Sequence, residues 1–423
     1  MNIFTSGDFL IPKTNDLYKW SVIACDQFTS DADYWRQVEQ KVGTEPSTLR
    51  LVLPEIYLNG DYSGRIADIN ATMQKYLQDG IFQEYTDSYV YVERTLLNGD
   101  IRRGVVGVVD LDNYDVAPDT KTAIRPTERT VLERIPPRKK IRENAALELS
   151  HILLLCDDAE DLLLGYLESN KDKLPLLYDF DLMQGGGHLR GYLVQGEMAK
   201  KFVARITRYE TKCCEKGDNA LLYAVGDGNH SLCTAKACYE AEKAGGGKNL
   251  RSRYAMVELE NIQDTSQKFE PIHRIVTDVD VTEILAELSK VQGINPSVSC
   301  ADSPPDWGPN RKCLPVRGGA EGGGVIIRVE SSDPSVLAVG VLQEFLDNYL
   351  AANGGKIDYI HDDAALRELA KAPNSVGFLL PPIDKNAFFN SIVVGGVLPR
   401  KTFSMGHGQE KRYYLEARRI KIK

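Results

Sequence analysis

An apolar run that stops at a glycine-rich polar turn is the feature of this sequence that most restricts its fold. Residues 221–225 are apolar and typical of a buried strand, and residues 234–243, rich in Ala, Lys and Glu, are typical of a helix. Asp227, Gly228 and Asn229 lie between them. The chain is therefore expected to pass from a buried strand into a helix here, with polar side chains at the helix N-terminus.

Such a turn has the chemistry of an anion site. The first amides of a helix lack intrahelical partners and lie at the positive end of its dipole, so they bind phosphate readily. Gly226 and Gly228 let the backbone approach a ligand closely. The turn also carries an acid, an amide, an imidazole and a hydroxyl, supplied by Asp227, Asn229, His230 and Ser231. The alternative is a helix start capped by Asn229 or Ser231 that binds nothing.

Charge and composition restrict the class of partner. The net charge of −9 argues against general nucleic-acid binding, which needs a concentrated basic surface. The eight cysteines show no spacing typical of zinc, and no metal site is predicted from them. Neither an export signal nor an apolar run of membrane-spanning length is apparent. These features predict a cytoplasmic protein without a membrane partner.

The rest of the chain mixes strands and helices. Asn98-Gly99 between the β-rich residues 89–96 and 103–110 predicts an antiparallel hairpin. A strand is expected at residues 20–25 and helices at residues 30–42 and 66–77. Two more helices are expected between residues 144 and 170, and residues 293–324 are expected to form a loop that serves as a linker or lid.

This pattern predicts an α+β fold with a mixed, largely antiparallel sheet and flanking helices. Two domains are expected: a core at residues 1–280 with inserted helices and hairpins, and a smaller α+β region at residues 281–423 packed on it.

Several stretches together resemble one family. They are the turn at residues 226–231 followed by Thr234-Ala235, and residues 22–28, 124–130, 148–151, 359–363, 376–382 and 398–404. The chain resembles the family called domain of unknown function 1015, whose usual turn is Ala-Asp-Gly-His-His-Arg. Asp227, Gly228 and His230 match that turn, whereas Asn229 and Ser231 replace the first His and the Arg. The lost Arg is the side chain best suited to phosphate.

The family's turn is also distantly similar to the phosphate-binding turn of the ParB/sulfiredoxin fold, which includes free-serine kinases. This resemblance implies a core of that type with family-specific additions. It also agrees with an anion site at the helix N-terminus.

The leading functional prediction is binding of a nucleotide or another phosphorylated small molecule, with phosphoryl transfer by a small-molecule kinase as the reaction. ATP or ADP with Mg²⁺ is the expected cofactor. The backbone of Gly228, Asn229 and Ser231 would hold phosphate oxygens, and His230 would donate a hydrogen bond or a proton. Asp227 would hold Mg²⁺ through water or anchor the turn.

Two further groups complete the predicted site. Asp26 is the candidate base that accepts a substrate hydroxyl proton. Arg125, Glu128 and Arg129 would replace the cationic contact that the missing turn Arg cannot supply.

Other roles for these side chains remain open. Asp26 is equally consistent with capping a turn, and the Arg125 group with a solvated ion-pair network. His151 beside a leucine run favours a structural histidine, and Asp362 or Asp363 favours a helix cap over a metal ligand beside His361. A non-catalytic protein that senses a phosphorylated ligand is the alternative to an enzyme.

Overall fold

The computed structural model describes most of the chain and divides it into two compact units. It describes residues 2–58, 60–117, 119–130, 135–248, 250–291, 294–298, 312–318, 324–329, 337–380, 382–399 and 401–421. For residues 294–298, 312–318, 324–329 and 338 only the backbone is described. The first unit comprises Met1–Gln267 and Gly406–Lys423, and the second comprises Lys268–Met405.

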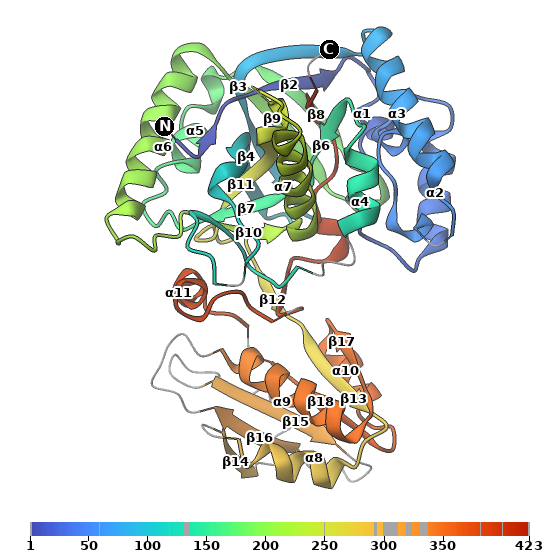
Figure 1. Ribbon diagram of the computed structural model, residues 1–423, viewed down its shortest axis with the longest axis vertical. Helices are drawn as coiled ribbons and strands as arrows, with labels where there is room; N and C mark the ends of the chain where they lie inside the picture. The colour runs from blue at the N-terminus through green and yellow to red at the C-terminus, as the bar shows by residue number, and fades with distance from the viewer. Residues whose placement is uncertain are drawn as a thin grey trace. The chain divides into compact units, whose positions relative to one another are not determined.

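The first unit is built on one mixed sheet (Figure 1). Its main path runs β5-β10-β7-β11-β4-β3-β2-β20-β6, with β1 paired to β4 and the β8–β9 hairpin joined to β3. The strands are β1 Phe4–Thr5, β2 Gly7–Pro12, β3 Phe82–Thr95, β4 Ile101–Asp110, β5 Ile124–Pro126, β6 Leu147–Leu149, β7 Leu153–Cys156, β8 Leu176–Asp181, β9 His188–Val194, β10 Tyr223–Asp227, β11 Tyr254–Asn261 and β20 Ala417–Arg419.

Helices cover this sheet on both faces. The α-helices are α1 Leu17–Trp20, α2 Ala32–Val42, α3 Ser63–Gln78, α4 Ile135–Arg142, α5 Leu164–Glu168, α6 Gly196–Cys214 and α7 Asn229–Ala244. Short 3-10 turns are η1 Thr48–Arg50, η2 Glu55–Tyr57, η3 Leu111–Asn113, η5 Lys171–Lys173, η6 Met183–Gly185, η7 Arg251–Arg253 and η8 Gly408–Glu410. Figure 1 shows α2 and α3 on one side of the unit and α6 on the other.

The sheet has a hydrophobic core on each face, and the side chains of the β3–β4 hairpin contribute to both. Successive residues of a strand point to opposite faces, so β3 contributes Val90 and Val92 to one core and Tyr89 and Tyr91 to the other. The first core packs against α2 and α3, and the second packs against α6 and α7. β3 and β4 pair antiparallel around Asn98-Gly99, as predicted.

The second unit contains two smaller sheets. The larger follows the order β14-β16-β15-β18-β13-β17, and β12 pairs with β19. Its strands are β12 Phe269–Pro271, β13 His273–Thr277, β14 Ile294–Val298, β15 Lys312–Gly318, β16 Gly324–Val329, β17 Lys356–Ile360, β18 Ser375–Phe378 and β19 Phe403–Met405. Its helices are α8 Val281–Leu288, α9 Ala338–Asn353, α10 Asp363–Leu369 and α11 Lys385–Gly395. Asp362 caps α10 through the amide of Ala365, which confirms the predicted cap.

The fold is therefore α+β, with a mixed, largely antiparallel sheet and flanking helices, as predicted. Helices predicted at residues 30–42 and 66–77 correspond to α2 and α3, and Asp31 caps α2. Among the described residues, every helix is too short or too polar to cross a bilayer.

Three local predictions differ from the structure. Residues 20–25 form one isolated bridge, Ile23 to Tyr413, instead of a strand, because they meet only a short irregular stretch of the C-terminal segment. The leucine run after His151 forms the buried strand β7, not a helix, since a short buried apolar run has no distinctive period. The expected loop at residues 293–324 contains β14, β15 and the first residue of β16, and its other parts lie outside the described residues.

The domain boundary also differs from residue 280. The first unit comprises the chain up to Gln267 and again from Gly406 onward. The C-terminal residues belong to it because β20 lies between β2 and β6 in its sheet. The C-terminal segment thus completes the sheet of the first unit.

Candidate functional site

The predicted turn joins β10 to α7 in the first unit. β5 pairs parallel with β10 and β7 pairs antiparallel, so the start of β7 lies opposite the end of β10. The register with β7 shifts between Val225 and Asp227, and such a bulge redirects the side chains that follow it. Figure 1 shows α7 in front of the sheet, and α4 packs beside it.

Gly228 is required at the start of α7. It is the N-cap residue and has a φ of 78°, in the left-handed region that favours glycine. A Cβ atom there would also lie 2.9 Å from the Cα atom of Ile152. The N-cap residue is glycine and has no side chain to accept the free amides of the first turn, so the alternative of a start capped by Asn229 or Ser231 is wrong.

Asp227, the last residue of β10, stabilises the turn through its side chain. Its Oδ1 accepts the Gly228 amide at 2.8 Å, and its Oδ2 lies 3.4 Å from the Nζ atom of Lys411. The lysine therefore brings a positive charge to the turn from the C-terminal segment of the chain.

Asn229 leaves a polar atom available at the helix start. Its amide nitrogen lies 3.5 Å from the Thr127 hydroxyl, which in turn donates to the Val225 carbonyl at 2.6 Å. Its Oδ1 atom is buried and has no hydrogen-bond partner among the described residues. A buried acceptor without a partner is costly in a folded protein, so a donor group on a ligand would be favoured there.

His151 joins Asp26 to the first turn of α7. Its Nε2 atom lies 3.2 Å from the Ser231 hydroxyl and 3.5 Å from the Asp26 carboxylate. Its Nδ1 atom lies 2.7 Å from the Tyr414 hydroxyl. Asp26, Ser231 and the buried His151 therefore meet at one point, although they are far apart in the sequence.

Electrostatics favour an ion pair between Asp26 and His151. Burial by itself would raise the pKa of Asp26, but the His151 imidazolium holds that pKa well below its usual range. Burial would lower the pKa of His151, and the Asp26 carboxylate outweighs this effect and raises it. The two shifts both favour an ionised carboxylate beside a protonated imidazole.

Tyr414 fixes the orientation of the imidazolium. Its hydroxyl is hydrogen-bonded to Nδ1 at 2.7 Å, accepts the Cys25 amide at 3.2 Å and lies 3.1 Å from the Cys25 sulfur. Burial raises the pKa of Cys25 to about 12 and that of Cys233 to about 11, so neither thiol is prepared for nucleophilic chemistry.

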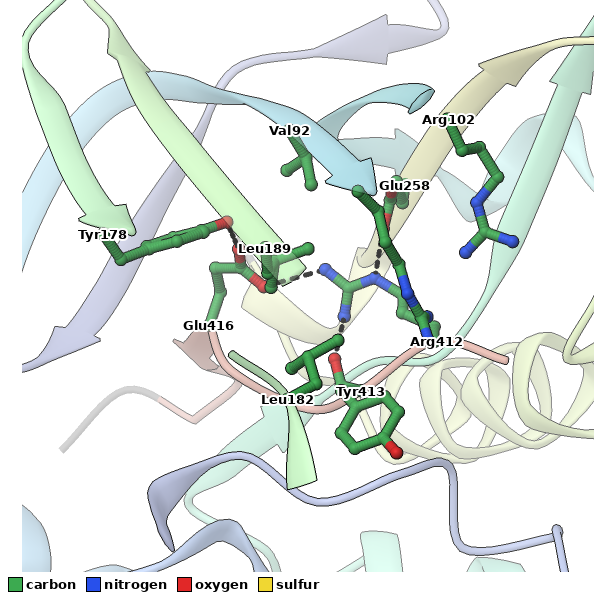
Figure 2. A pocket seen from close by; sticks show the side chains of 10 residues that line it. Val92, Arg102, Tyr178, Leu182, Leu189, Glu258, Arg412, Tyr413 and Glu416 are labelled. Carbon is green, nitrogen blue, oxygen red and sulfur yellow. Dashed lines mark hydrogen bonds and ion pairs between the residues drawn. The ribbon is translucent and has the colours of Figure 1, made fainter. Parts of the chain in front are cut away.

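A buried ionic network anchors the segment that carries Lys411 and Tyr414. Figure 2 shows the guanidinium of Arg412 between two carboxylates. Its Nε atom donates to Glu258 at 2.6 Å and its Nη2 atom donates to Glu416 at 2.8 Å. The Tyr178 hydroxyl donates to Glu416 at 2.5 Å. The pocket between these side chains holds about 10 Å³, room for no more than one water molecule.

Arg94 anchors the same segment from β3. Its guanidinium donates to the carbonyls of Gln409, Glu410 and Lys411 at 2.8, 3.1 and 2.6 Å. Arg94 and Arg412 together hold the C-terminal segment against the sheet, which places Lys411 and Tyr414 at the turn.

Of the predicted cationic group Arg125, Glu128 and Arg129, only the last two lie on the side of the sheet where the turn is. Glu128 and Arg129 follow β5 on the edge where β10 ends, and Arg129 is exposed. The Arg125 guanidinium is directed to the opposite end of β10, where it donates to the Asn219 and Thr122 carbonyls. Among the described residues, no group of three His, Cys, Asp or Glu side chains could hold a metal ion.

Three side chains at the turn were missed as site residues. The leucine run beside His151 favours a structural role for this residue and predicts a helix there. Recognising β7 as a strand beside β10 would have placed His151 at the turn. Lys411 and Tyr414 reach the turn only through tertiary contacts, so no local signal could have identified them.

Comparisons with solved structures find weak likenesses. A free serine kinase in complex with AMP is 13% identical, with 74% of this chain and 90% of that chain covered and a TM-score of 0.38. SbnI with a C-terminal truncation from Staphylococcus aureus is 10% identical, with 71% and 82% covered and a TM-score of 0.37. A conserved hypothetical protein from Pyrococcus furiosus is 13% identical, with 73% and 90% covered and a TM-score of 0.35.

Structural similarity this weak is not evidence for the function of this protein. The ParB/sulfiredoxin type of core therefore stays a prediction. No curated protein matches the sequence significantly. The family model described as "Protein of unknown function (DUF1015)" matches residues 10–418, so the chain belongs to that family.

Proposed function

We propose that the turn between β10 and α7 binds the phosphate of a nucleotide or another phosphorylated small molecule, and that the protein transfers a phosphoryl group to a small hydroxyl compound. The observation that carries this proposal is the meeting of Asp26, His151 and Ser231 at the start of α7.

The turn supplies three groups that suit a phosphate. The N-cap residue of α7, Gly228, makes no side-chain cap, and the helix start carries the positive end of the dipole of a long helix. Lys411 adds a positive charge beside Asp227. His151 adds a ring nitrogen 3.2 Å from the Ser231 hydroxyl, and Asp26 raises its pKa, which favours the form that donates from both nitrogens. These groups partly compensate for the family arginine that Ser231 replaces.

Asp26 has the position of a group that handles the substrate hydroxyl. Its carboxylate is about a quarter exposed and is held ionised beside His151. In the proposed reaction the substrate hydroxyl oxygen attacks the terminal phosphorus of the nucleotide, and the bond from phosphorus to the bridging oxygen breaks. The hydroxyl proton passes to Asp26 and the nucleoside diphosphate leaves with the electron pair of the broken bond.

The described side chains suit a nucleotide that brings Mg²⁺ with it better than a resident metal. Both oxygens of Asp227 already have partners, in the Gly228 amide and Lys411. Phosphate oxygens and water would therefore supply most Mg²⁺ ligands, as is common for this ion. Bound Mg²⁺ would neutralise charge on the phosphates.

The test separates binding from transfer. Titration calorimetry with ATP, ADP and AMP, with and without Mg²⁺, measures binding, and labelled ATP with a panel of small hydroxyl compounds measures transfer. Asp26→Asn is expected to lower turnover by roughly 100-fold or more and to leave nucleotide affinity within about threefold. Asp33→Asn, an exposed carboxylate in α2, is the matched control. Unchanged turnover in Asp26→Asn would remove the base role, and no nucleotide binding at millimolar concentration would reject the proposal.

One observation favours a non-catalytic sensor as the second candidate. A carboxylate whose pKa lies well below its usual range is a weak base, and the Asp26–His151 pair has that property. A sensor would bind the nucleotide with the same dependence on Lys411 but show no transfer to any hydroxyl compound.

A further inference from the structure

A cavity of about 690 Å³ lies in the first unit at the far end of α7 from the turn. Its wall includes Tyr239 and Lys243 from the second half of α7, the residues around β1 and β2, and the start of β11. Pockets that bind small molecules commonly measure about 300–1,000 Å³, so the volume suits a metabolite. The proposed function makes no use of this cavity.

Positive side chains dominate the charge of its wall. The cations are Lys243, Arg251, Arg253, Arg418 and Arg419, and the acids are Asp8 and Asp110. Three of the cations are already well paired. Arg253 donates to Asp110 at 2.9 and 2.6 Å, Arg418 donates to Glu148 at 2.6 Å, and Lys243 lies 3.1 Å from Asp112.

Arg251 and Arg419 differ from these three. The nearest carboxylate oxygen of Asp8 lies 3.9 Å from Arg251, and that of Glu84 lies 3.9 Å from Arg419. Both distances exceed hydrogen-bonding distance, and neither guanidinium donates to another described residue. The two side chains are 38% and 26% exposed. Two guanidinium groups with available donors therefore line one cavity.

The acids of the wall do not cancel this charge. Asp110 is hydrogen-bonded to Arg253. Asp8 accepts the Asp87 amide at 3.1 Å through Oδ1, and its Oδ2 atom lies 3.9 Å from Arg251, too far for a hydrogen bond that would occupy the guanidinium donors. The C-terminal end of α7 carries a partial negative charge, but Lys243 lies in its last turn. A guanidinium presents a planar set of donors that matches phosphate and carboxylate groups.

We propose that this cavity binds a small multivalent anion, either a phosphorylated metabolite or a polycarboxylate, through Arg251 and Arg419. The apolar side chains of Val108 and Leu250 in the same wall would contact the carbon part of the ligand. A concave site with two available guanidinium groups fits a small molecule better than a nucleic acid, which needs an extended basic surface.

Titration calorimetry at low salt with pyrophosphate and with citrate tests this proposal. We expect at least one of the two to bind, with the preference between them identifying phosphate or carboxylate as the natural group. The double variant Arg251→Gln with Arg419→Gln is expected to weaken binding by roughly 100-fold, because each charged hydrogen-bonding group contributes roughly tenfold. Arg36→Gln, an exposed arginine in α2, should bind as the wild type does.

The turn site must be separated from the cavity. Lys411→Gln alters the turn and should leave cavity binding within about twofold, because the two sites share no residue. Thermal melting checks that the double variant is folded, and if it is not, Arg251→Gln alone should weaken binding roughly tenfold. Equal affinity of wild type and folded arginine variants would overturn the proposal. So would loss of binding in Lys411→Gln, or no binding of either anion at millimolar concentration.

Discussion

The turn and the buried network both contain residues of the C-terminal segment, but their charged groups differ in how completely they are paired. Arg412, Glu258 and Glu416 are buried and donate or accept at short distances, so the network is saturated. At the turn, Lys411 lies 3.4 Å from its partner and the Asn229 oxygen has none among the described residues. Charged groups with a full set of short hydrogen bonds fix the position of a segment, whereas polar groups with long or missing contacts are available to a ligand.

The largest effect is expected in the network. Arg412→Met should lower the free energy of unfolding by about 3–5 kcal/mol, because it leaves Glu258 and Glu416 buried without a compensating charge. Urea denaturation at neutral pH measures the change. Arg36→Met is the exposed control, with an expected change within about 0.5 kcal/mol. A loss below about 1 kcal/mol would show that the network is not the anchor.

Gly228 tests the backbone of the turn. Gly228→Ala should lower the free energy of unfolding by about 2–4 kcal/mol, since alanine at a φ of 78° is strained and its Cβ would meet Ile152. Gly99→Ala is the matched control, with a φ of 86° and open space around the Cβ position. The control should lose only about 1–2 kcal/mol by denaturant unfolding. Equal losses would mean that the contact with Ile152 is unimportant.

The Asp26–His151 pair should give a pH-dependent contribution to stability. The raised pKa of His151 stabilises the folded state fully below the ordinary value of 6.5, and this contribution is lost as pH rises through the higher folded-state pKa. The lowered pKa of Asp26 stabilises the folded state above the ordinary value of 3.8, and this contribution is lost at lower pH.

Comparing the stability of the wild type with that of Asp26→Asn therefore measures the contribution of the Asp26–His151 ion pair to the free energy of unfolding. The difference in free energy of unfolding should be about 1.5–3 kcal/mol between the two ordinary pKa values and should shrink on either side. Urea denaturation across this pH range, with an NMR titration of the His151 ring, gives both quantities. A constant difference at all pH values would contradict an ion pair.

The smallest effect on stability is expected at Lys411. Lys411→Met should change the free energy of unfolding by about 1 kcal/mol, because the lysine and Asp227, although largely buried, are 3.4 Å apart and do not form a short hydrogen bond. The same variant should weaken nucleotide binding roughly tenfold by calorimetry, since it removes a charge from the proposed phosphate site. The opposite pattern, with stability lost and binding kept, would place Lys411 with the network.

Local sequence was sufficient for those elements whose residues show a clear pattern. The hairpin around Asn98-Gly99 follows from turn chemistry, and α2 follows from its period and the Asp31 cap. The passage from a strand to a helix around residues 226–231 also follows from the sequence, because an apolar run ends there and a helix-forming stretch follows.

The tertiary structure decided which side chains meet at that turn. Asp26 was predicted there, but His151 required β7 to be recognised as a strand, and a short leucine run does not distinguish strand from helix. Lys411 and Tyr414 come from a segment more than a hundred residues away, anchored by Arg94 and Arg412. The sequence alone determined that a glycine-containing turn joins a strand to a helix here, because strand, glycine and helix are local features. Its charges come from long-range contacts, which no local pattern encodes.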